Sequence, residues 1–252
     1  MTKKIIFMGS RPVGYSCLKY LLENETALDV KVVGVLTEDN KEFNKKLSLI
    51  ELAKKNNIRI VADLEKYLTI KDFDILISVQ YHRILKKRHI DKAKQIAVNL
   101  HMAPLPEYRG CNQFSFAILN NDREFGTTIH QLGEGIDSGP ILFEKRFPIP
   151  KNCFVKNLYD LTSRQSLRLF KERIKDIIDG RYIPKDQCNF LSERKCSLHY
   201  RKEIDGIKKI DPNWPEEKIF RHFRATYMPG FEPPYMLINN TKVYLTLAKE
   251  AI

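Results

Sequence analysis

Long apolar runs are absent from this 252-residue sequence. No run approaches the roughly 20 residues that are needed to cross a bilayer. The first residues include an apolar stretch, but it ends at Gly9-Ser10-Arg11-Pro12, which is too early for a signal peptide. We therefore expect a cytoplasmic protein that has no membrane partner and is long enough to bury a substantial core.

Closely spaced cysteines are also absent. The cysteines are odd in number, and none lies two or four residues from another, as paired zinc or redox cysteines would. We expect the thiols to be reduced and mostly structural, and we expect no metal cofactor. The five cysteines are Cys17, Cys111, Cys153, Cys188 and Cys196.

Acidic residues are fewer than basic ones, which gives a formal net charge of +12. Such a balance favours an anionic partner: nucleic acid, a membrane surface, or a small phosphorylated or polycarboxylate ligand. The basic residues occur in short groups such as Lys54-Lys55 and Lys86-Lys87-Arg88, without a long basic arm. Solvated helix faces explain most of these groups, so we expect no nucleic-acid partner.

Short β-branched runs alternate with helical stretches through the first half of the sequence. This alternation requires a parallel sheet covered by helices on both faces, because each crossover returns the chain to the same edge. The fold class is therefore expected to be α/β, with a doubly wound, mostly parallel sheet. The expected strands are 4–9, 30–36, 58–61, 74–79 and 96–100, and the expected helices are 13–23 and 47–56.

The alternation of β-branched runs and helical stretches ends after Asn99. A ligand-binding site is expected there because ligands of open α/β sheets bind beyond the carboxyl ends of the strands. A long helix at 157–179, ended by Gly180, is expected to close the main domain. We therefore predict a main domain over residues 1–181. The other elements expected in this part are a helix at 112–119 and strands near 127–132 and 141–147.

Residues 182–252 are richer in proline and charge, and they are predicted to form a small α+β region. A short helix is expected at 215–224, with Pro215 at its first position. The apolar runs 235–238 and 242–247 are joined by Asn239-Asn240-Thr241, which suits a tight hairpin because Asn tolerates positive φ. A lone hairpin is marginal in water, so we expect this one to pack on the main domain or on a second subunit.

Three polar residues stand where chemistry is expected. Asn99 and His101 end an apolar strand, and their spacing of two places both side chains on one face of it. Asn supplies an amide donor for developing negative charge, and His supplies a base that titrates near neutral pH. Asp137 lies between glycines in a tight loop, where a carboxylate can orient an imidazole. Taken one by one, neither segment is decisive: a strand-end Asn beside a satisfied His is the favoured reading of the first two residues, and an Asx-turn also explains Asp137.

Four motifs in order make the combination specific. They are Asn99-Leu-His101, Leu105-Pro-Glu-Tyr-Arg109-Gly110, Gly126-Thr-Thr-Ile-His130 and Gly135-Ile-Asp137-Ser-Gly139-Pro-Ile141. Together they resemble the formyltetrahydrofolate-dependent formyltransferases, and the resemblance extends more loosely from Lys4 to about Gly180. It implies a Rossmann-like formyltransferase fold and transfer of a formyl group from N10-formyltetrahydrofolate to an amine, without a metal.

The resemblance also implies residue roles. Asn99 corresponds to the oxyanion donor, His101 to the proton acceptor and Asp137 to the group that fixes the histidine. The folate is implied to lie against segments that hold it largely through backbone atoms. The residues of those segments are Tyr81, Ile84, Leu85, Leu132, Gly133, Gly135 and Ile136; ordinary strand-to-helix packing is an alternative for the first three.

The acceptor amine distinguishes the subfamilies. The segment Tyr108–Ile118 and the tail with Ile210-Asp211-Pro212 and Arg224–Phe231 look like enzymes that formylate nucleoside-diphosphate-linked amino dideoxy sugars for O-antigen or capsule. A dTDP-linked 4-amino-4,6-dideoxyglucose or 3-amino-3,6-dideoxygalactose, or GDP-perosamine, is therefore the expected acceptor. The residues expected to bind it are Ser10, Arg11, Met102, Arg109, Asn112, Gln113, Tyr227 and Phe231.

Structural roles are alternatives to several of these binding assignments. Arg109 suits a loop-anchoring ion pair, Asn112 a helix cap, and Tyr227 and Phe231 core packing. His130, in the middle of a strand, is more typical of a satisfied core histidine than of a catalyst.

Two other functions stay open at this point. A methionyl-tRNA formyltransferase would suit the basic charge, but its C-terminal barrel needs more residues than follow Arg181. A non-catalytic nucleotide- or RNA-binding module would explain the sheet and the charge without the three polar residues. For the assembly we predict a homodimer through the C-terminal hairpin, which would otherwise expose apolar edges.

Overall fold

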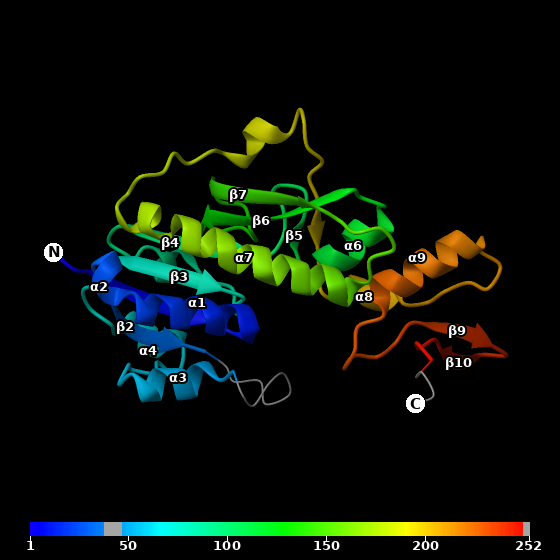
Figure 1. Cartoon of the computed structure of the whole chain (residues 1–252), viewed down its shortest axis with the longest axis horizontal. Helices are drawn as coiled ribbons and strands as arrows, with labels where there is room; N and C mark the ends of the chain where they lie inside the picture. The colour runs from blue at the N-terminus through cyan, green and yellow to red at the C-terminus, as the bar shows by residue number, and fades with distance from the viewer. Residues whose placement is uncertain (38–46, 249–252) are drawn as a thin grey trace.

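A six-stranded sheet in the order β2-β1-β3-β4-β6-β7 forms the centre of the protein. The computed structural model describes residues 1–37 and 47–248. The first four strands in this order are parallel, and β6 and β7 are antiparallel additions beside β4. This confirms the predicted doubly wound, mostly parallel α/β sheet (Figure 1). The strands are β1 Lys3–Gly9, β2 Val30–Leu36, β3 Ile75–Val79, β4 Ile96–His101, β6 Glu124–Gln131 and β7 Ile141–Pro148.

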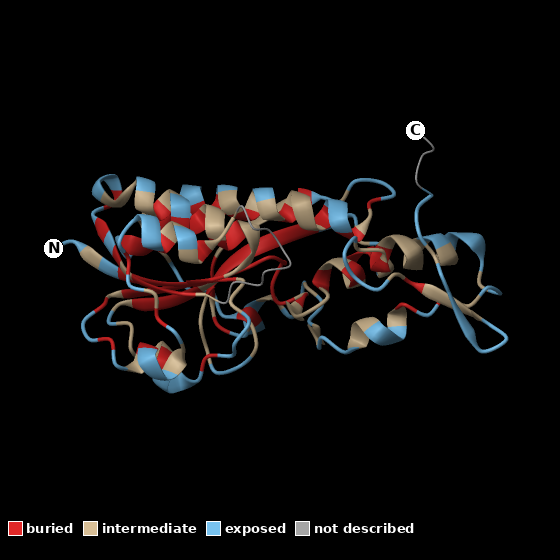
Figure 2. Cartoon of the chain, turned by 90° about the horizontal axis from the view of Figure 1, so that it is seen from below, coloured by how far each residue is buried: buried red, intermediate tan, exposed pale blue. Residues whose placement is uncertain are grey.

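Both faces of the sheet are buried, as Figure 2 shows. Successive β1 residues face opposite ways, so Ile5 and Phe7 enter one apolar cluster while Ile6 and Met8 enter another. The first cluster includes buried residues of α1 and α7, and the second includes Tyr67 of α4. The helices of this part are α1 Arg11–Glu23, α2 Glu25–Leu28, α3 Leu49–Lys55, α4 Leu64–Leu68, α5 Lys87–Ile90, α6 Gln113–Leu119 and α7 Val155–Ile178.

One predicted strand is wrong. Residues 58–61 form no strand, and only Ile60 bridges Val35 on the outer side of β2. The apolar side chains Ile58 and Val61 are buried, which produced the strand-like pattern. The remaining predicted elements are present with boundaries shifted by a few residues.

A third apolar cluster joins α6, the start of α7 and the C-terminal region. Its buried members include Ala117 of α6, Leu158 of α7 and Ala225 of α9. The helix α9 begins after Pro215, which is the N-cap residue and not the first helical residue as predicted. The elements after α7 are the 3-10 helix η1 Gln187–Phe190, β8 Leu198–His199, α8 Glu203–Ile207, α9 Glu216–Thr226, β9 Tyr235–Ile238 and β10 Thr241–Tyr244.

The C-terminal hairpin is present as predicted. Strands β9 and β10 pair antiparallel, and Asn239 and Asn240 both adopt the positive φ that a two-residue turn requires. The hairpin meets the preceding segment where Tyr235 bridges Lys209, while Val243 and Tyr244 on β10 stay exposed. The predicted boundary at residues 181 and 182 stays a prediction.

None of the helices in the described part of the chain is both long and apolar enough to span a membrane.

Candidate active site

The carboxyl end of β4 places the first two candidate side chains. Asn99 and His101 lie on this strand, which runs between β3 and β6. In the register of β4 with β6, Asn99 stands opposite His130. A third polar side chain therefore joins the two that the spacing in β4 predicts.

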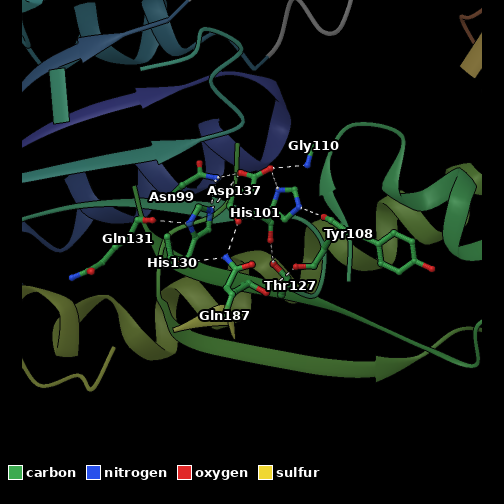
Figure 3. Close-up of polar contacts among 12 residues, drawn as sticks. Asn99, His101, Tyr108, Gly110, Thr127, His130, Gln131, Asp137 and Gln187 are labelled. Carbon is green, nitrogen blue, oxygen red and sulfur yellow. Dashed lines mark hydrogen bonds and ion pairs between the residues drawn. The ribbon is translucent and has the colours of Figure 1, made fainter. Parts of the chain in front are cut away.

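The loop that follows β6 brings Asp137 onto this group (Figure 3). Its Oδ1 accepts a hydrogen bond from Asn99 Nδ2 at 3.4 Å, and its Oδ2 lies 3.5 Å from His101 Nδ1. The backbone N–H of Gly110 donates to Asp137 Oδ2 at 2.9 Å. The predicted convergence of Asn99, His101 and Asp137 is therefore present in the structure.

Backbone carbonyls fix the rings of both histidines. The carbonyl oxygen of Tyr108 lies 2.7 Å from His101 Nε2, and that of Gln131 lies 2.7 Å from His130 Nδ1. Because a carbonyl oxygen only accepts hydrogen bonds, each of these nitrogens carries a proton. The opposite nitrogen of each ring faces Asp137 at 3.5 Å.

Asp137 is a carboxylate at neutral pH. Burial alone would raise its pKa, but the imidazoles of His101 and His130 and the N–H of Gly110 outweigh burial and hold the pKa below its ordinary value. The side chain of Asp137 is 15% exposed, compared with 5% for His101. Asp137 is therefore the more accessible of these two side chains.

His130 is a buried histidine that also contacts a candidate catalytic side chain. It is buried and its Nδ1 is satisfied, as a core histidine would be. Its Nε2 nevertheless lies 3.2 Å from Asn99 Nδ2, close enough to accept a hydrogen bond from that amide. Sequence reasoning missed this contact, and the signal that could have found it is the pairing of Asn99 with His130 across two strands.

The C-terminal segment holds the loop that leads away from His101. Strand β5, Arg109–Gly110, pairs with β8, and the Cys111 N–H donates to the carbonyl of His199 at 2.8 Å. Gly110 has a φ of +86°, and a Cβ there would lie 2.2 Å from the His199 oxygen. Only glycine fits at this position, so the backbone N–H that reaches Asp137 depends on it.

The residues predicted to hold a cofactor lie in two loops beside β3 and β6. Ile84 is exposed, whereas Leu85 is buried in the second apolar cluster, where Tyr81 and Leu132 also pack. The burial of Leu85 favours packing over ligand contact for its side chain. The loop residues Gly133, Gly135 and Ile136 are partly or fully exposed.

The residues predicted to bind the acceptor are more dispersed. Ser10 donates its hydroxyl to the carbonyl of Gln80, between β1 and β3. Met102 is fully buried in the main core, which favours packing over ligand contact. Burial lowers the pKa of the Arg11 guanidinium; Tyr159 opposes this effect, and the charge of Arg201 adds to it.

The remaining acceptor candidates contact the protein itself. Asn112 is an N-cap residue, but its side chain caps nothing and donates instead to the carbonyl oxygens of Tyr200 and Arg201. Arg109 donates to Cys196 Sγ, which is an anchoring contact, and it forms no ion pair with the residues that the structure describes. Gln113 is buried at the start of α6. Tyr227 packs against Phe223, and Phe231 is half exposed.

No group of three or more His, Cys, Asp or Glu residues within 1–37 and 47–248 is arranged to hold a metal ion. Two surface hollows of about 470 and 500 Å³ open elsewhere, one near Lys3 and Gln95 and one between α1 and α3.

The part of the chain that contains this polar group matches a known protein family. Residues 3–174, which include every strand of the main sheet and the polar group around Asp137, match the family described as formyl transferase. The chain belongs to this formyltransferase family. The family that the four motifs predicted is therefore confirmed.

Two curated formyltransferases align over most of this chain. The GDP-perosamine N-formyltransferase of Brucella melitensis is 29% identical, over 86% of this chain and 83% of its own length. The methionyl-tRNA formyltransferase of Clostridium acetobutylicum is 30% identical, over 88% of this chain and 73% of its own length.

A solved formyltransferase structure extends the likeness into the C-terminal region. The N-formyltransferase of Helicobacter canadensis, solved with folinic acid and dTDP-3-aminofucose, is 29% identical and has a TM-score of 0.79. The alignment covers 96% of this chain and 86% of that one.

Proposed function

We propose that this protein transfers a formyl group from N10-formyltetrahydrofolate to the amine of a nucleoside-diphosphate-linked amino dideoxy sugar. The likeness to the Helicobacter canadensis enzyme carries the proposal, because it includes the C-terminal region as well as the catalytic core. The GDP-perosamine enzyme of Brucella melitensis supports the same substrate class. Candidate acceptors are dTDP-4-amino-4,6-dideoxyglucose, dTDP-3-amino-3,6-dideoxygalactose and GDP-perosamine.

In the proposed reaction the unprotonated amine attacks the formyl carbon, and the carbonyl electron pair moves to the formyl oxygen. Asn99 Nδ2 stabilises this oxyanion. One of its hydrogens points to His130 Nε2 at 3.2 Å and the other to Asp137 Oδ1 at 3.4 Å. The longer contact is the weaker one and can be exchanged for the formyl oxygen.

His101 receives the proton that the attacking nitrogen loses. Its Nε2 is engaged by the Tyr108 carbonyl, so Nδ1 is the accepting atom. The carboxylate of Asp137 lies 3.5 Å from that nitrogen and stabilises the charged ring. Collapse of the tetrahedral intermediate then breaks the bond between the formyl carbon and N10 of the folate. N10 takes up the proton held by His101 as it leaves, which returns the imidazole to its neutral form.

The folate is proposed to lie against the loops of residues 81–85 and 132–137, with backbone atoms holding its pteridine ring. The position of Asp137 at the end of the second loop supports this placement, because the formyl carbon has to reach the carboxylate's neighbours. The exposed Ile84 provides apolar surface in the first loop.

The diphosphate of the acceptor is proposed to meet Arg11 and Arg201. The charge of Arg201 acts on the Arg11 guanidinium, and an anion bound at Arg11 would offset both that repulsion and the cost of burial. Ser10 precedes Arg11, and Arg201 follows the strand β8 that pairs with the loop of Gly110. Tyr227 and Phe231 are proposed to stack on the base or the sugar.

Methionyl-tRNA is the competing acceptor, since the Clostridium acetobutylicum enzyme is equally similar in sequence. The purified protein, 10-formyltetrahydrofolate and a panel of nucleotide amino sugars would be incubated beside a reaction that contains methionyl-tRNA. Mass spectrometry is expected to show one sugar gaining a CO unit. Formylation of the tRNA alone, or RNA retention on a filter without any transfer, would overturn the proposal.

The setting and the assembly complete the proposal. We propose a cytoplasmic enzyme of O-antigen or capsule biosynthesis that forms a homodimer through its C-terminal hairpin. Support for the dimer comes from the apolar side chains that the hairpin leaves exposed. They are Ile238, Val243, Tyr244 and, just beyond β10, Leu247.

A further inference from the structure

Gln187 contacts the loop of Asp137. In sequence it lies beyond residue 174, where the family match ends. Its Nε2 donates to the carbonyl oxygen of Asp137 at 2.7 Å and to that of Gly139 at 2.9 Å. The residue is buried at the start of η1. In the view of Figure 3, Gly110 and Gln187 lie on opposite sides of Asp137.

A short backbone ladder brings Gln187 to this position. The N–H of Ile141 donates to the carbonyl of Lys185 at 2.8 Å, and the N–H of Lys185 donates back at 2.9 Å. These bonds fix the chain two residues before Gln187 against the first residue of β7. Gln187 can therefore hold the loop that immediately precedes β7.

The loop needs such support because its backbone is strained. Asp137 has a φ of 47°, a left-handed conformation that few residues other than glycine adopt readily. The contacts of its carboxylate with other side chains are long, at 3.4 Å to Asn99 and 3.5 Å to each histidine, whereas the Gly110 N–H is bound at 2.9 Å. A small shift of the backbone at Asp137 would therefore move the carboxylate out of reach of the imidazoles.

We infer that Gln187 is a positioning residue that sets the place of the Asp137 carboxylate by clamping the two carbonyl oxygens of the turn at 137–139. The inference rests on the proposed role of Asp137 in formyl transfer. It assigns part of the catalytic geometry to the C-terminal segment, which the family match does not include.

The chain contains a matched control for this clamp. Gln95 also donates its Nε2 to two backbone carbonyls, those of Ile177 at 3.1 Å and Ile178 at 3.0 Å. As in Gln187, its Oε1 is buried and makes no hydrogen bond within the described residues. Gln95 lies at the opposite end of β4 from His101, so Gln95→Met removes the same kind of clamp away from the site.

The Gly110 amide is a direct reporter of the carboxylate, because its N–H donates to Asp137 Oδ2. NMR of the full chain would follow this amide in the wild type and in the Gln187→Met, Gln95→Met and Asp137→Asn variants. In Gln187→Met we expect the chemical shift of the Gly110 amide to change. Its hydrogen exchange should become about tenfold faster, which corresponds to the loss of one hydrogen bond. Gln95→Met should lower stability without moving Gly110.

Transfer activity gives the second readout. With 10-formyltetrahydrofolate and GDP-perosamine or dTDP-3-aminofucose, Gln187→Met should lower kcat about 10–100-fold and leave KM within about threefold. The same substitution in an Asp137→Asn background should cost less than about threefold, because the carboxylate it positions is already gone. If Gln187→Met does not fold, Gln187→Asn, whose shorter amide cannot reach both carbonyls, is measured in the same way.

A Gly110 amide that Gln187→Met leaves unchanged would overturn the inference. Losses of kcat from Gln187→Met and Asp137→Asn that multiply in the double variant, as they do for two independent residues, would also overturn it. If Asp137→Asn transfers formyl groups at the wild-type rate while Gly110 still moves in Gln187→Met, the catalytic role of Asp137 fails and Gln187 still positions its side chain. If none of the proposed nucleotide amino sugars reacts while Gly110 still moves in Gln187→Met, the proposed function fails and the positioning role stands.

Discussion

Replacing Asp137 with asparagine keeps the shape of the side chain and removes its charge. The variant retains an oxygen that can accept the Gly110 N–H, now at 2.9 Å, so the loop should keep its conformation. It loses the carboxylate that faces His101 Nδ1 at 3.5 Å. The substitution therefore tests the charge separately from the fold.

The expected cost follows from the proposed role. A group that stabilises a protonated imidazole in the transition state contributes about 10²–10⁴ in rate, or roughly 3–5 kcal/mol of barrier. Because Asp137 is not proposed to bind the nucleotide, KM for the acceptor should change little. We thus predict a fall in kcat of two to four orders of magnitude, on the order given by general acid–base catalysis.

Single-turnover transfer from 10-formyltetrahydrofolate, measured by mass spectrometry, would report the chemical step. Asp160→Asn is the matched control, because Asp160 pairs with Lys156 on the surface of α7. Urea unfolding would show that both variants are folded. A folded Asp137→Asn variant with kcat within about threefold of the wild type would refute the catalytic assignment.

Three further predictions concern binding, assembly and stability. Arg11→Met should raise KM for the nucleotide sugar about tenfold or more with kcat nearly unchanged, as for loss of a charge-assisted hydrogen bond; an unchanged KM would separate Arg11 from the diphosphate. Val243→Asp should convert a homodimer into monomers in sedimentation velocity, because it places charge on the exposed face of β10; a wild-type protein that sediments as a monomer would contradict the proposed dimer. Burial lowers the pKa of His89 from its ordinary 6.5, so the folded protein resists a proton that the unfolded chain accepts. Stability should therefore be independent of this group above pH 6.5 and fall as the pH drops below it, and His89→Asn should flatten that dependence in urea titrations; identical slopes would show that His89 does not titrate on unfolding.

Local patterns were enough to predict most of the fold. The alternation of apolar runs with helical stretches predicted the parallel strands, because buried parallel strands are apolar on both faces. The pair Asn239 and Asn240 predicted the hairpin through its tolerance of positive φ. The segment at 58–61 was misread because burial of Ile58 and Val61 produces the same apolar pattern whether or not a ladder forms.

The site was predicted only where its residues are close in sequence or belong to a motif. The spacing of Asn99 and His101 follows from one strand, and Asp137 follows from its glycine-flanked loop. His130 joins the group through strand register, and Gln187 through packing of a segment 50 residues beyond Asp137. Contacts of this kind depend on tertiary structure, which a single sequence does not display.

Asn99, His101 and Asp137 are proposed to surround the reacting formyl group. A crystal structure with an unreactive formylfolate and a nucleotide amino sugar tests it most directly. The formyl oxygen is predicted to lie about 2.7–3.2 Å from Asn99 Nδ2, with the sugar amine near His101 Nδ1 and Asp137. A formyl group bound away from these three side chains would contradict the account.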